Sequence, residues 1–377
     1  MPENLPAPGP LNGVRVVDLS RLLPGPFCSW YLSALGAEVI RVESPRQPDY
    51  TRALPPMACG QSVFFAAVNR GKSSVALEWR EPAGLAALER LIGSADVVLE
   101  GFKPGRMAAS GLDPEALLER HPGLVIASIS GFGQTGALRE EPGHDLNYLG
   151  YAGFVAGLRP GEGVDPLPLQ IADVAGGALT AALGVAAALF GRERSGEGRW
   201  LDISMTDGSL SMMTPMLAFA LGEGRDLRPA GEMLTGAYAT YRTYVCADGG
   251  LICVGALEPK FLEGLVAQLV ARGIAPPAPT AEAMGALFAT RPRDEWVEML
   301  QACCVSPALR ATELAAHPLH VSRDNFEDVL GVALPKAPFR WATSSELPAL
   351  GADTRAVLAP LGVDVDALIA AGAAKES

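Results

Sequence analysis

The sequence predicts an α/β protein in which a large domain is built on a doubly wound parallel sheet and a smaller domain is α+β. Up to residue 204, short runs of β-branched residues alternate with stretches of helical spacing, a pattern typical of parallel β-α-β units. After a segment rich in glycine and arginine at residues 222–231, two strand-like runs joined by a glycine-bearing turn precede helical stretches. A chain of 377 residues is long enough for about two domains.

The elements follow from this pattern in order. Strands of the large domain are expected at residues 14–19, 38–42, 74–77, 97–99, 124–128 and 200–204. Helices are expected at residues 27–35, 82–92, 114–119 and from Asp173 to about Arg194. The small domain should contain a hairpin over residues 240–246 and 251–254, then helices to about residue 325, with an extended segment at 335–340 and one helix from residue 353. We therefore place the large domain at residues 1–222, completed by 326–377, and the small domain at 223–325.

Composition narrows the class of protein. The net charge of −12 argues against broad nucleic-acid binding, because phosphate contacts need a basic surface, although a few lysines and arginines can still hold one anionic ligand. The six cysteines form no CxxC motif and are expected to be reduced thiols. No cationic start with an apolar run opens the chain, and the apolar stretch at residues 178–190 is short for a membrane span. We expect a cytoplasmic protein without nucleic-acid or membrane partners.

A dinucleotide-binding enzyme is the first hypothesis that alternating strands and helices suggest. The turn after the first strand contradicts it, because residues 20–26 contain no GxGxxG and carry Pro24 and Pro26 where a pyrophosphate would need free N–H groups. Glu43 ends the second strand, where a ribose-binding acid would stand, but alone it is weak evidence.

A metal site is not expected. His317 and His320 form an HxxH pattern near the adjacent Cys303 and Cys304. This spacing, with Pro318 inside it, does not put both rings on one helical face, and neighbouring cysteines are a poor arrangement for zinc.

Three other residues can support acid–base chemistry. His144 stands in a polar cluster between a Pro-Gly turn and an apolar run, and its ordinary role would be to cap a helix. Asp173 opens the long helix, where it is expected to be the N-cap, beside N–H groups that could also hold a developing oxyanion. Glu258 directly follows a strand and could orient an imidazole and raise its basicity.

Motifs along nearly the whole chain, from residue 11 to about His320, carry a family resemblance. They lie at residues 11–18, 24–28, 35–43, 130–136, 143–148, 172–177, 195–198 and 255–259. Together they are highly specific. On these residues the chain resembles the family III coenzyme A transferase superfamily, and within it the α-methylacyl-CoA racemase branch.

The resemblance implies a choice between two reactions. In the transferases, the residue matching Asp173 is a nucleophile that forms a mixed anhydride with the acyl group. The racemases instead carry a histidine at the position of His144 and a glutamate at that of Glu258, and they transfer a proton at the carbon beside the thioester carbonyl. The expected activity is therefore interconversion of (2R)- and (2S)-2-methylacyl-CoA through an enolate, in fatty acid metabolism. A family III acyl-CoA:carboxylate CoA transferase and a non-catalytic acyl-CoA-binding protein are the alternatives.

The resemblance also implies partners and binding residues. It implies a Rossmann-like large domain and an interlocked homodimer in which Glu258 approaches His144 across the interface, with no cofactor besides the CoA of the substrate. Ends of expected strands and the 143–148 motif supply the CoA contacts, which would come from Leu77, Arg80, Gly101, Phe102, Lys103, Arg106, Gly143, Asp145, Asn147, Tyr148 and Tyr241.

The chain departs from the family pattern at three places. Ser44 stands where an arginine is frequent, with Arg46 as a candidate replacement, and Ala109 matches another arginine, with Arg106 one turn earlier. Racemases usually read Asn-Met-Leu-Asp-Gly-Gly-Ala-Pro before the hairpin, whereas residues 232–239 read Glu-Met-Leu-Thr-Gly-Ala-Tyr-Ala. Because this segment is expected to shape the acyl pocket, the acyl group stays open.

Overall fold

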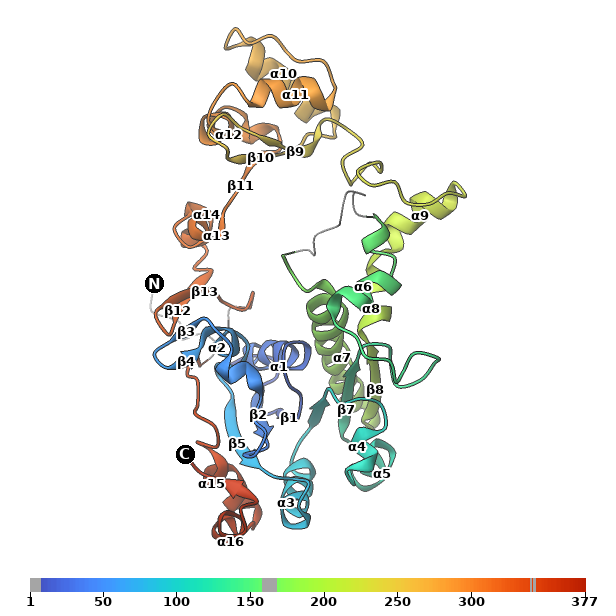
Figure 1. Ribbon diagram of the computed structural model, residues 1–377, viewed down its shortest axis with the longest axis vertical. Helices are drawn as coiled ribbons and strands as arrows, with labels where there is room; N and C mark the ends of the chain where they lie inside the picture. Colours follow the sequence, from blue (N-terminus) through green and yellow to red (C-terminus); the bar gives the residue numbers. More distant parts are fainter. Residues whose placement is uncertain (1–7, 158–167, 340, 342–343) are drawn as a thin grey trace. The chain divides into compact units, whose positions relative to one another are not determined.

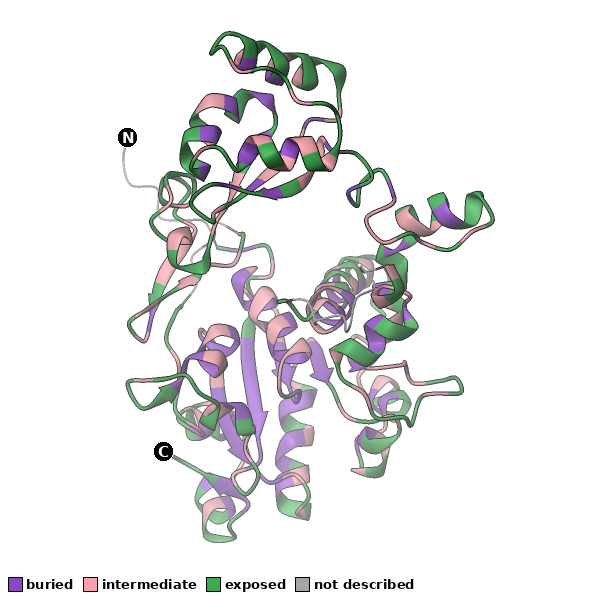
Figure 2. Cartoon of the chain, turned by 45° about the horizontal axis from the view of Figure 1, so that its top comes forward, coloured by how far each residue is buried: buried purple, intermediate pink, exposed green. Residues whose placement is uncertain are grey.

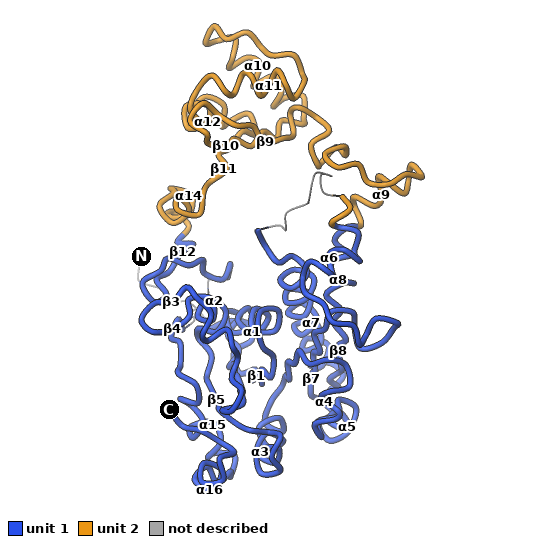
Figure 3. The backbone as a smooth tube through the Cα atoms, in the orientation of Figure 1, with its two compact units in different colours: residues 1–154, 166–213, 324–377 blue, residues 155–165, 214–323 orange. Residues whose placement is uncertain are grey.

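The computed structural model describes residues 8–157, 168–339, 341 and 344–377, and the chain divides into two compact units (Figure 3). Unit 1 comprises residues 1–154, 166–213 and 324–377, and unit 2 comprises residues 155–165 and 214–323. The sequence placed the two boundaries at 222/223 and 325/326. The structure instead assigns helix α9 (Thr214–Gly222) to unit 2, and it adds a short second stretch of chain at 155–165 to that unit.

Unit 1 is built on a seven-stranded sheet of order β14-β5-β2-β1-β6-β7-β8 (Figure 1). Its strands are β1 (Arg15–Asp18), β2 (Glu38–Glu43), β5 (Ser73–Leu77), β6 (Val97–Glu100), β7 (Val125–Ser130), β8 (Arg199–Ser204) and β14 (Ala374–Lys375). All neighbours pair in parallel except β14, which is antiparallel to β5. The six parallel strands have the order 3-2-1-4-5-6, so the sheet is doubly wound, as the sequence predicts, and its switch point lies between β1 and β6.

Helices cover both faces of this sheet. One face packs its apolar side chains against α3 (Pro82–Gly93), α5 (Pro114–Arg120), α15 (Thr354–Leu358) and α16 (Val365–Ala370), and Figure 2 shows the buried strands between the helices. The other face is covered by α1 (Pro24–Ala34) and α7 (Thr180–Ser195). The residues of β6 and β7 are all buried, as expected for central strands covered on both sides. The single C-terminal helix expected from residue 353 is two short helices followed by β14.

Shorter elements complete unit 1 and the connection to unit 2. They are β3 (Met57–Ala58), β4 (Gln61–Ser62), α2 (Val63–Asn69), α4 (Arg106–Ala109), α6 (Asp145–Tyr151), α8 (Met205–Met212), β12 (Phe326–Val329), β13 (Val332–Pro335), the single turns η1 (Tyr50–Ala53) and η5 (Ala359–Leu361), and in unit 2 η2 (Val155–Gly157), η4 (Gln301–Cys303), α13 (Ala311–Leu314) and α14 (Pro318–Ser322).

The long helix expected from Asp173 begins in an unexpected form. Residues Ala172–Leu179 (η3) are π-helical and continue directly into α7, which ends at Gly196 with a left-handed φ of 74°. Gly176 and Gly208 bring η3 and α8 together backbone to backbone, since a Cβ on either would overlap the other helix. A π-helical turn is frequent at functional sites.

By length and composition alone, residues Ala172–Ser195 could also cross a membrane, and no other helix in the described ranges passes that test. In the structure η3 lies against α1 and α8, and α7 lies against β7 and β8.

A buried charge cluster organises the turn after β1. The Asp18 carboxylate accepts hydrogen bonds from the N–H of Ser20 at 2.9 Å and from Ser29 Oγ at 2.5 Å, and it lies 3.4 Å from Lys72 Nζ and 3.6 Å from Arg41. Burial lowers the pKa of Lys72 to about 7. Because Asp18 pairs with both cations, the turn that follows β1 at the switch point is held without a glycine-rich motif.

Unit 2 is an α+β unit with a three-stranded antiparallel sheet of order β11-β10-β9. The predicted hairpin is formed by β9 (Tyr241–Val245) and β10 (Leu251–Gly255), and β11 (Val305–Ala308) adds to β10. One face of the sheet packs with α10 (Pro259–Val270), α11 (Ala281–Phe288) and α12 (Arg293–Leu300) around the buried Phe288 and Trp296. The sequence missed β11, since its four residues include Pro307 and pair with a strand about fifty residues earlier.

Candidate active site

His144 stands at the start of α6. Its backbone is extended, its carbonyl accepts the N–H of Asn147 at 2.8 Å, and its own N–H donates to Asn147 Oδ1 at 3.0 Å. This reciprocal pair fixes the first turn of the helix and leaves His144 exposed. The histidine is therefore a helix N-cap residue, as its ordinary role would be, and its ring is accessible.

The two motifs at 130–136 and 143–148 pack against each other around Tyr148. The buried Tyr148 donates its hydroxyl to the carbonyl of Gly143 at 2.5 Å, and its ring meets Phe132 edge-on at 5.2 Å. A Cβ at Gly131 or Gly143 would overlap the Tyr148 ring, so both positions need glycine. Tyr148 thereby holds the chain just before His144 against the end of β7.

Asp173 lies beside this helix. Its backbone N–H donates to Asp145 Oδ1 at 2.9 Å, which joins η3 to the first residue of α6. Burial, and after it the charge of Asp145, raises the pKa of Asp173 to about 7. A carboxyl group that titrates near neutral pH can serve both as an acid and as a base.

The expected N-cap role of Asp173 is wrong. The helix already begins two residues earlier, since Ile171 is the N-cap residue of η3 and Asp173 lies inside its first turn. The N–H groups of Asp173 and Val174 are both occupied, by Asp145 and by the carbonyl of Gln170. These two donors are therefore not free to hold an oxyanion.

The loops at the switch point are the second part of the site. Gly101, Phe102 and Lys103 follow β6, and a Cβ on Gly101 would lie 3.8 Å from Ser20 Cβ in the loop after β1. Lys103 is exposed, whereas the Phe102 ring packs partly buried against the core. Open α/β sheets bind ligands at such an edge.

Of the two CoA contacts expected at and after β5, the side chain of Arg80 is accessible and that of Leu77 is not. Leu77 is fully buried in the core, so only its backbone could meet a ligand. Arg80 is exposed, 3.7 Å from the Glu78 carboxylate.

The two candidate replacements for family arginines differ in their partners. The Arg46 guanidinium is paired with Glu81 at 2.8 Å. Within the described ranges, Arg106 on α4 is exposed and has no acidic partner. Ser44 is buried, donates to Glu78 and accepts the N–H groups of Arg46 and Gln47, so it belongs to the turn itself.

One acid at this edge was not anticipated. Glu100 ends β6, is buried, and accepts the N–H of Phe102 at 2.6 Å. Burial raises the pKa of Glu100 to about 7, and Asp202 adds to the effect. The only signal in the sequence was an acid at the end of an otherwise apolar strand, which does not distinguish it from Glu43.

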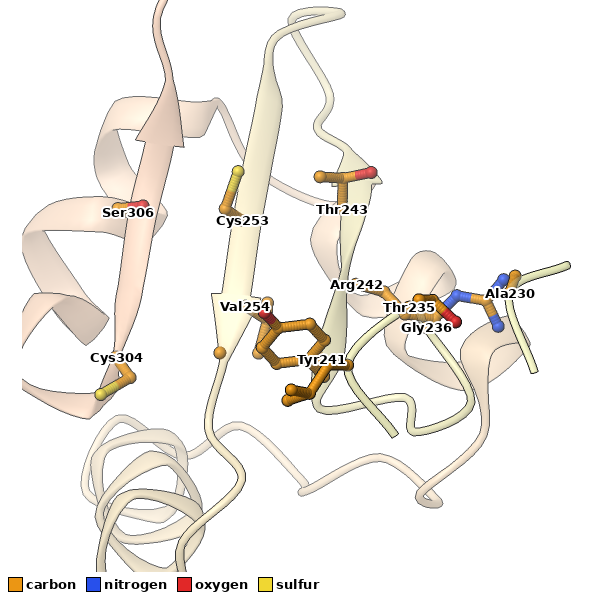
Figure 4. Close-up of a pocket in the computed structure, with 12 residues that line it drawn as sticks. Ala230, Thr235, Gly236, Tyr241, Arg242, Thr243, Cys253, Val254, Cys304 and Ser306 are labelled. Carbon is orange, nitrogen blue, oxygen red and sulfur yellow. The ribbon is translucent and has the colours of Figure 1, made fainter. Parts of the chain in front are cut away.

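In unit 2, Glu258 and Tyr241 occupy different surroundings. Glu258 is the N-cap residue of α10 and is exposed, and the described part of the chain gives its carboxylate neither a hydrogen bond nor an ion pair. Tyr241 lines a cavity of about 740 Å³ together with Leu234, Thr235 and Gly236 (Figure 4). The segment in which the sequence departs from the racemases therefore does line a pocket.

Within the described ranges, no group of three or more His, Cys, Asp or Glu side chains could hold a metal ion. The rings of His317 and His320 meet at 6.0 Å between centroids, and His317 Nδ1 accepts the N–H of Leu319.

Unit 1 thus combines a doubly wound sheet of order 3-2-1-4-5-6 with an exposed histidine and a carboxyl group whose pKa is raised by burial to about 7. The chain belongs to CoA-transferase family III, whose sequence model matches residues 11–354. The resemblance stated from the motifs is thereby confirmed.

Relatives within the family carry both activities in their names. The chain is 36% identical to the human (Homo sapiens) alpha-methylacyl-CoA racemase over 332 residues, which is 84% of this chain and 82% of that protein. It is 38% identical to the acetyl-CoA:oxalate CoA-transferase of Acetobacter aceti over 217 residues, 56% of each chain. The crystal structure of a CAIB/BAIF family protein from Brucella suis superposes with a TM-score of 0.81 at 27% identity, covering 94% of this chain and all of that one. The chain is accordingly an enzyme of family III, a racemase or a CoA transferase.

Proposed function

We propose that this enzyme interconverts (2R)- and (2S)-2-methylacyl-CoA by proton transfer at the carbon beside the thioester carbonyl. One observation carries the proposal. The residue next to His144, Asp145, is hydrogen-bonded to Asp173, so an accessible imidazole and a carboxyl with a pKa of about 7 come from two joined segments of unit 1. The 36% identity to a racemase over most of the chain supports it.

The reaction needs a base on one face of the α-carbon and an acid on the other. His144 takes the α-proton, the C–H electron pair moves into the thioester to form an enolate, and protonated Asp173 returns a proton to the opposite face. For the other enantiomer the two groups exchange roles. Because the pKa of Asp173 is about 7, both of its forms are populated at neutral pH. No cofactor is needed besides the CoA of the substrate.

The edge loops of unit 1 supply the proposed CoA contacts. Arg80, Lys103 and Arg106 are exposed cations after β5 and β6, suited to the CoA phosphates. Residues 143–148, with Asn147 and Tyr148, lie beside Asp173 and would line the thioester end, as would the backbone at Gly101. The exposed face of the partly buried Phe102 ring would stack on the adenine of CoA.

We further propose a homodimer in which Glu258 of one chain orients His144 of the other. Mixing H144Q chains with E258Q chains tests this. If Glu258 acts across the interface, each mixed dimer regains one intact pair, about a quarter of all sites in a statistical mixture. If it acts within its own chain, mixing restores nothing.

A CoA transferase is the second candidate, because a relative of that name matches over 217 residues. There the Asp173 carboxylate would attack the thioester carbonyl, form a mixed anhydride and release CoA as the thiolate. Partial burial of Asp173 would shield the anhydride from water.

Exchange of the α-proton in deuterated water distinguishes the epimerase from the CoA transferase. Incubated with (2S)-2-methylacyl-CoA, the enzyme should place deuterium at the α-carbon and generate the 2R epimer, and H144Q should lose the epimerisation. Absence of exchange on every branched acyl-CoA tried would exclude the epimerase. Hydroxylamine trapping of an Asp173 acyl adduct, absent in D173N, would instead establish the transferase.

A further inference from the structure

Glu100 ends β6 at the switch point, just before the loop of residues 101–103, and no step of the proposed reaction uses it. Its side chain turns back onto this loop, because Glu100 Oε2 accepts the N–H of Phe102 at 2.6 Å. Among the residues that the structure describes, no other side chain is hydrogen-bonded to residues 101–103. The buried carboxyl of Glu100 is therefore the side-chain anchor of the loop.

The strand register gives Glu100 polar neighbours. Glu100 pairs with Ser128 on β7, and Ser128 pairs with Asp202 on β8, so the three side chains lie side by side on one face of the sheet. Trp200 Nε1 donates to Ser128 Oγ at 2.8 Å and holds that hydroxyl in place. Burial raises the pKa of Glu100 to about 7, against the lowering effects of Ser128 and of the Phe102 N–H. An apolar residue would avoid this cost of burial, which argues that the carboxyl has a role besides packing.

The loop that follows β6 lies between two other segments of the switch-point edge. A Cβ on Gly101 would lie 3.7 Å from the carbonyl oxygen of Ile129 at the end of β7 and 3.8 Å from Ser20 Cβ after β1. The Phe102 ring packs against the core, whereas Lys103 is exposed. Because these two side chains share one short stretch of backbone, a rotation of the backbone at Phe102 would move both of them.

We propose that Glu100 is a positioning residue for coenzyme A, which holds the Phe102 N–H so that residues 101–103 are ordered before the ligand binds. The inference rests on the proposed CoA contacts of Phe102 and Lys103, and it adds a residue that the proton transfer does not use. An anchored loop raises affinity, because less backbone has to be ordered during binding. The anchor acts as a hydrogen-bond acceptor and does not need the negative charge.

Three variants separate this role from a contribution to stability. E100Q keeps an oxygen that can accept the Phe102 N–H and loses the charge. E100L has a similar size and no acceptor. L368A is the control, because Leu368 is buried on α16 in the same core, and its truncation leaves a cavity that weakens unit 1 without touching the loop.

Hydrogen–deuterium exchange of the full-length protein measures the order of the loop without a ligand. Peptides that cover residues 100–106 are followed by mass spectrometry. E100L should speed exchange at the Phe102 amide roughly fivefold or more, because the hydrogen bond that protects it is gone. E100Q and L368A should exchange at this amide like the wild type, since local opening of the loop controls its rate.

Calorimetric titration of the full-length variants with free coenzyme A measures the function of the anchor. E100L should bind at least about fivefold more weakly than the wild type, and both E100Q and L368A should stay within about twofold of it. In the α-proton exchange assay, E100L should raise the KM for acyl-CoA and leave kcat within about twofold.

Three results would show that the proposal is wrong. They are wild-type affinity for coenzyme A in E100L, binding by E100Q as weak as that by E100L, and a wild-type protein that does not bind coenzyme A. Binding of coenzyme A does not require the reaction. The expected order of affinities in an enzyme that exchanges no α-proton would therefore exclude the epimerase and support the role of Glu100.

Discussion

Asp145 Oδ1 accepts the backbone N–H of Asp173 at 2.9 Å, across 28 residues of sequence. This one contact has two effects. It fastens the first turn of α6, with His144 before it, to the π-helical segment η3. It also brings a second carboxylate near Asp173, which adds to burial in raising the pKa of Asp173 to about 7. Positioning of the two proposed proton-transfer groups and adjustment of one pKa are therefore coupled.

D145N separates these two effects, since asparagine keeps the acceptor oxygen and loses the charge. The pKa of Asp173 should fall below about 7, yet stay above its ordinary value, because burial is the larger cause and persists. The corresponding limb of the pH profile of kcat/KM for α-proton exchange should move to lower pH. An unmoved limb would mean that Asp173 does not titrate in the reaction.

D173N should stabilise the fold, most strongly at alkaline pH. A carboxyl whose pKa is raised in the folded state favours folding below its unfolded value of 3.8, and this contribution is lost as pH rises through about 7. The mutant's gain in free energy of unfolding, measured with urea, should therefore be larger at pH 8 than at pH 5. D226N, at an exposed aspartate, is the control and should show no such pH-dependent gain. A gain equal at both pH values would contradict the assigned pKa shift.

E258Q should reduce exchange without weakening the fold. Glu258 is exposed and unpaired within the described ranges, so its neutral replacement should change the free energy of unfolding by no more than about 0.5 kcal/mol. If Glu258 orients His144, as proposed, E258Q should lower kcat at least about tenfold. E263Q, on the exposed side of the same helix, should leave both unchanged. Full activity in E258Q would remove this residue from the mechanism.

R106Q should raise the KM for acyl-CoA more than R46Q does. Arg46 is already paired with Glu81, whereas Arg106 is exposed with no acid beside it in the described structure. A charge-assisted hydrogen bond to a CoA phosphate is worth about 1.5–3 kcal/mol, which corresponds to a rise of roughly tenfold or more. A dephospho-CoA thioester distinguishes which phosphate is contacted. Equal effects of the two changes would show that the ion pair of Arg46 opens for the ligand.

G143A and G150A make a matched pair at the two ends of the α6 region. A methyl group on Gly143 would overlap the Tyr148 ring, so G143A should destabilise the protein by about 1–3 kcal/mol and displace His144. Gly150 lies inside α6 with open space where a Cβ would go, so G150A should stabilise by about 0.5–1 kcal/mol. Urea unfolding of both variants checks the two signs. Destabilisation of similar size in both would mean that the Tyr148 contact is not what requires Gly143.

The sheet of unit 1 was predictable because its central strands are short runs of mostly apolar, often β-branched residues. Val16 and Val17, like the whole of β6, are buried on both faces, and such runs are read easily from β-branched residues. β11 and β14 were not, because each is short and owes its strand form to a partner far away in the sequence. Long-range pairing of this kind leaves no local pattern.

The candidate active site could be predicted from the sequence only in part. His144 and Asp173 were found through motifs, but the contact that joins them runs through Asp145, which carried no sign of it. The N-cap expected at Asp173 failed because the helix starts earlier and with π-helical spacing. Glu100 owes its raised pKa mainly to burial, which cannot be read from residue type alone.

The position of β14 at the edge of the sheet affects how the chain folds during synthesis. It pairs with β5, and the residues before it complete the same edge, since Asp353 accepts the N–H of Ser74 at 2.7 Å and Thr354 that of Ala76 at 3.1 Å. During synthesis β5 emerges long before these partners, so its row of unpaired N–H and C=O groups stays open while all of unit 2 is translated. Until residues 353–375 have been made, this edge of the growing chain is open to pairing with another strand.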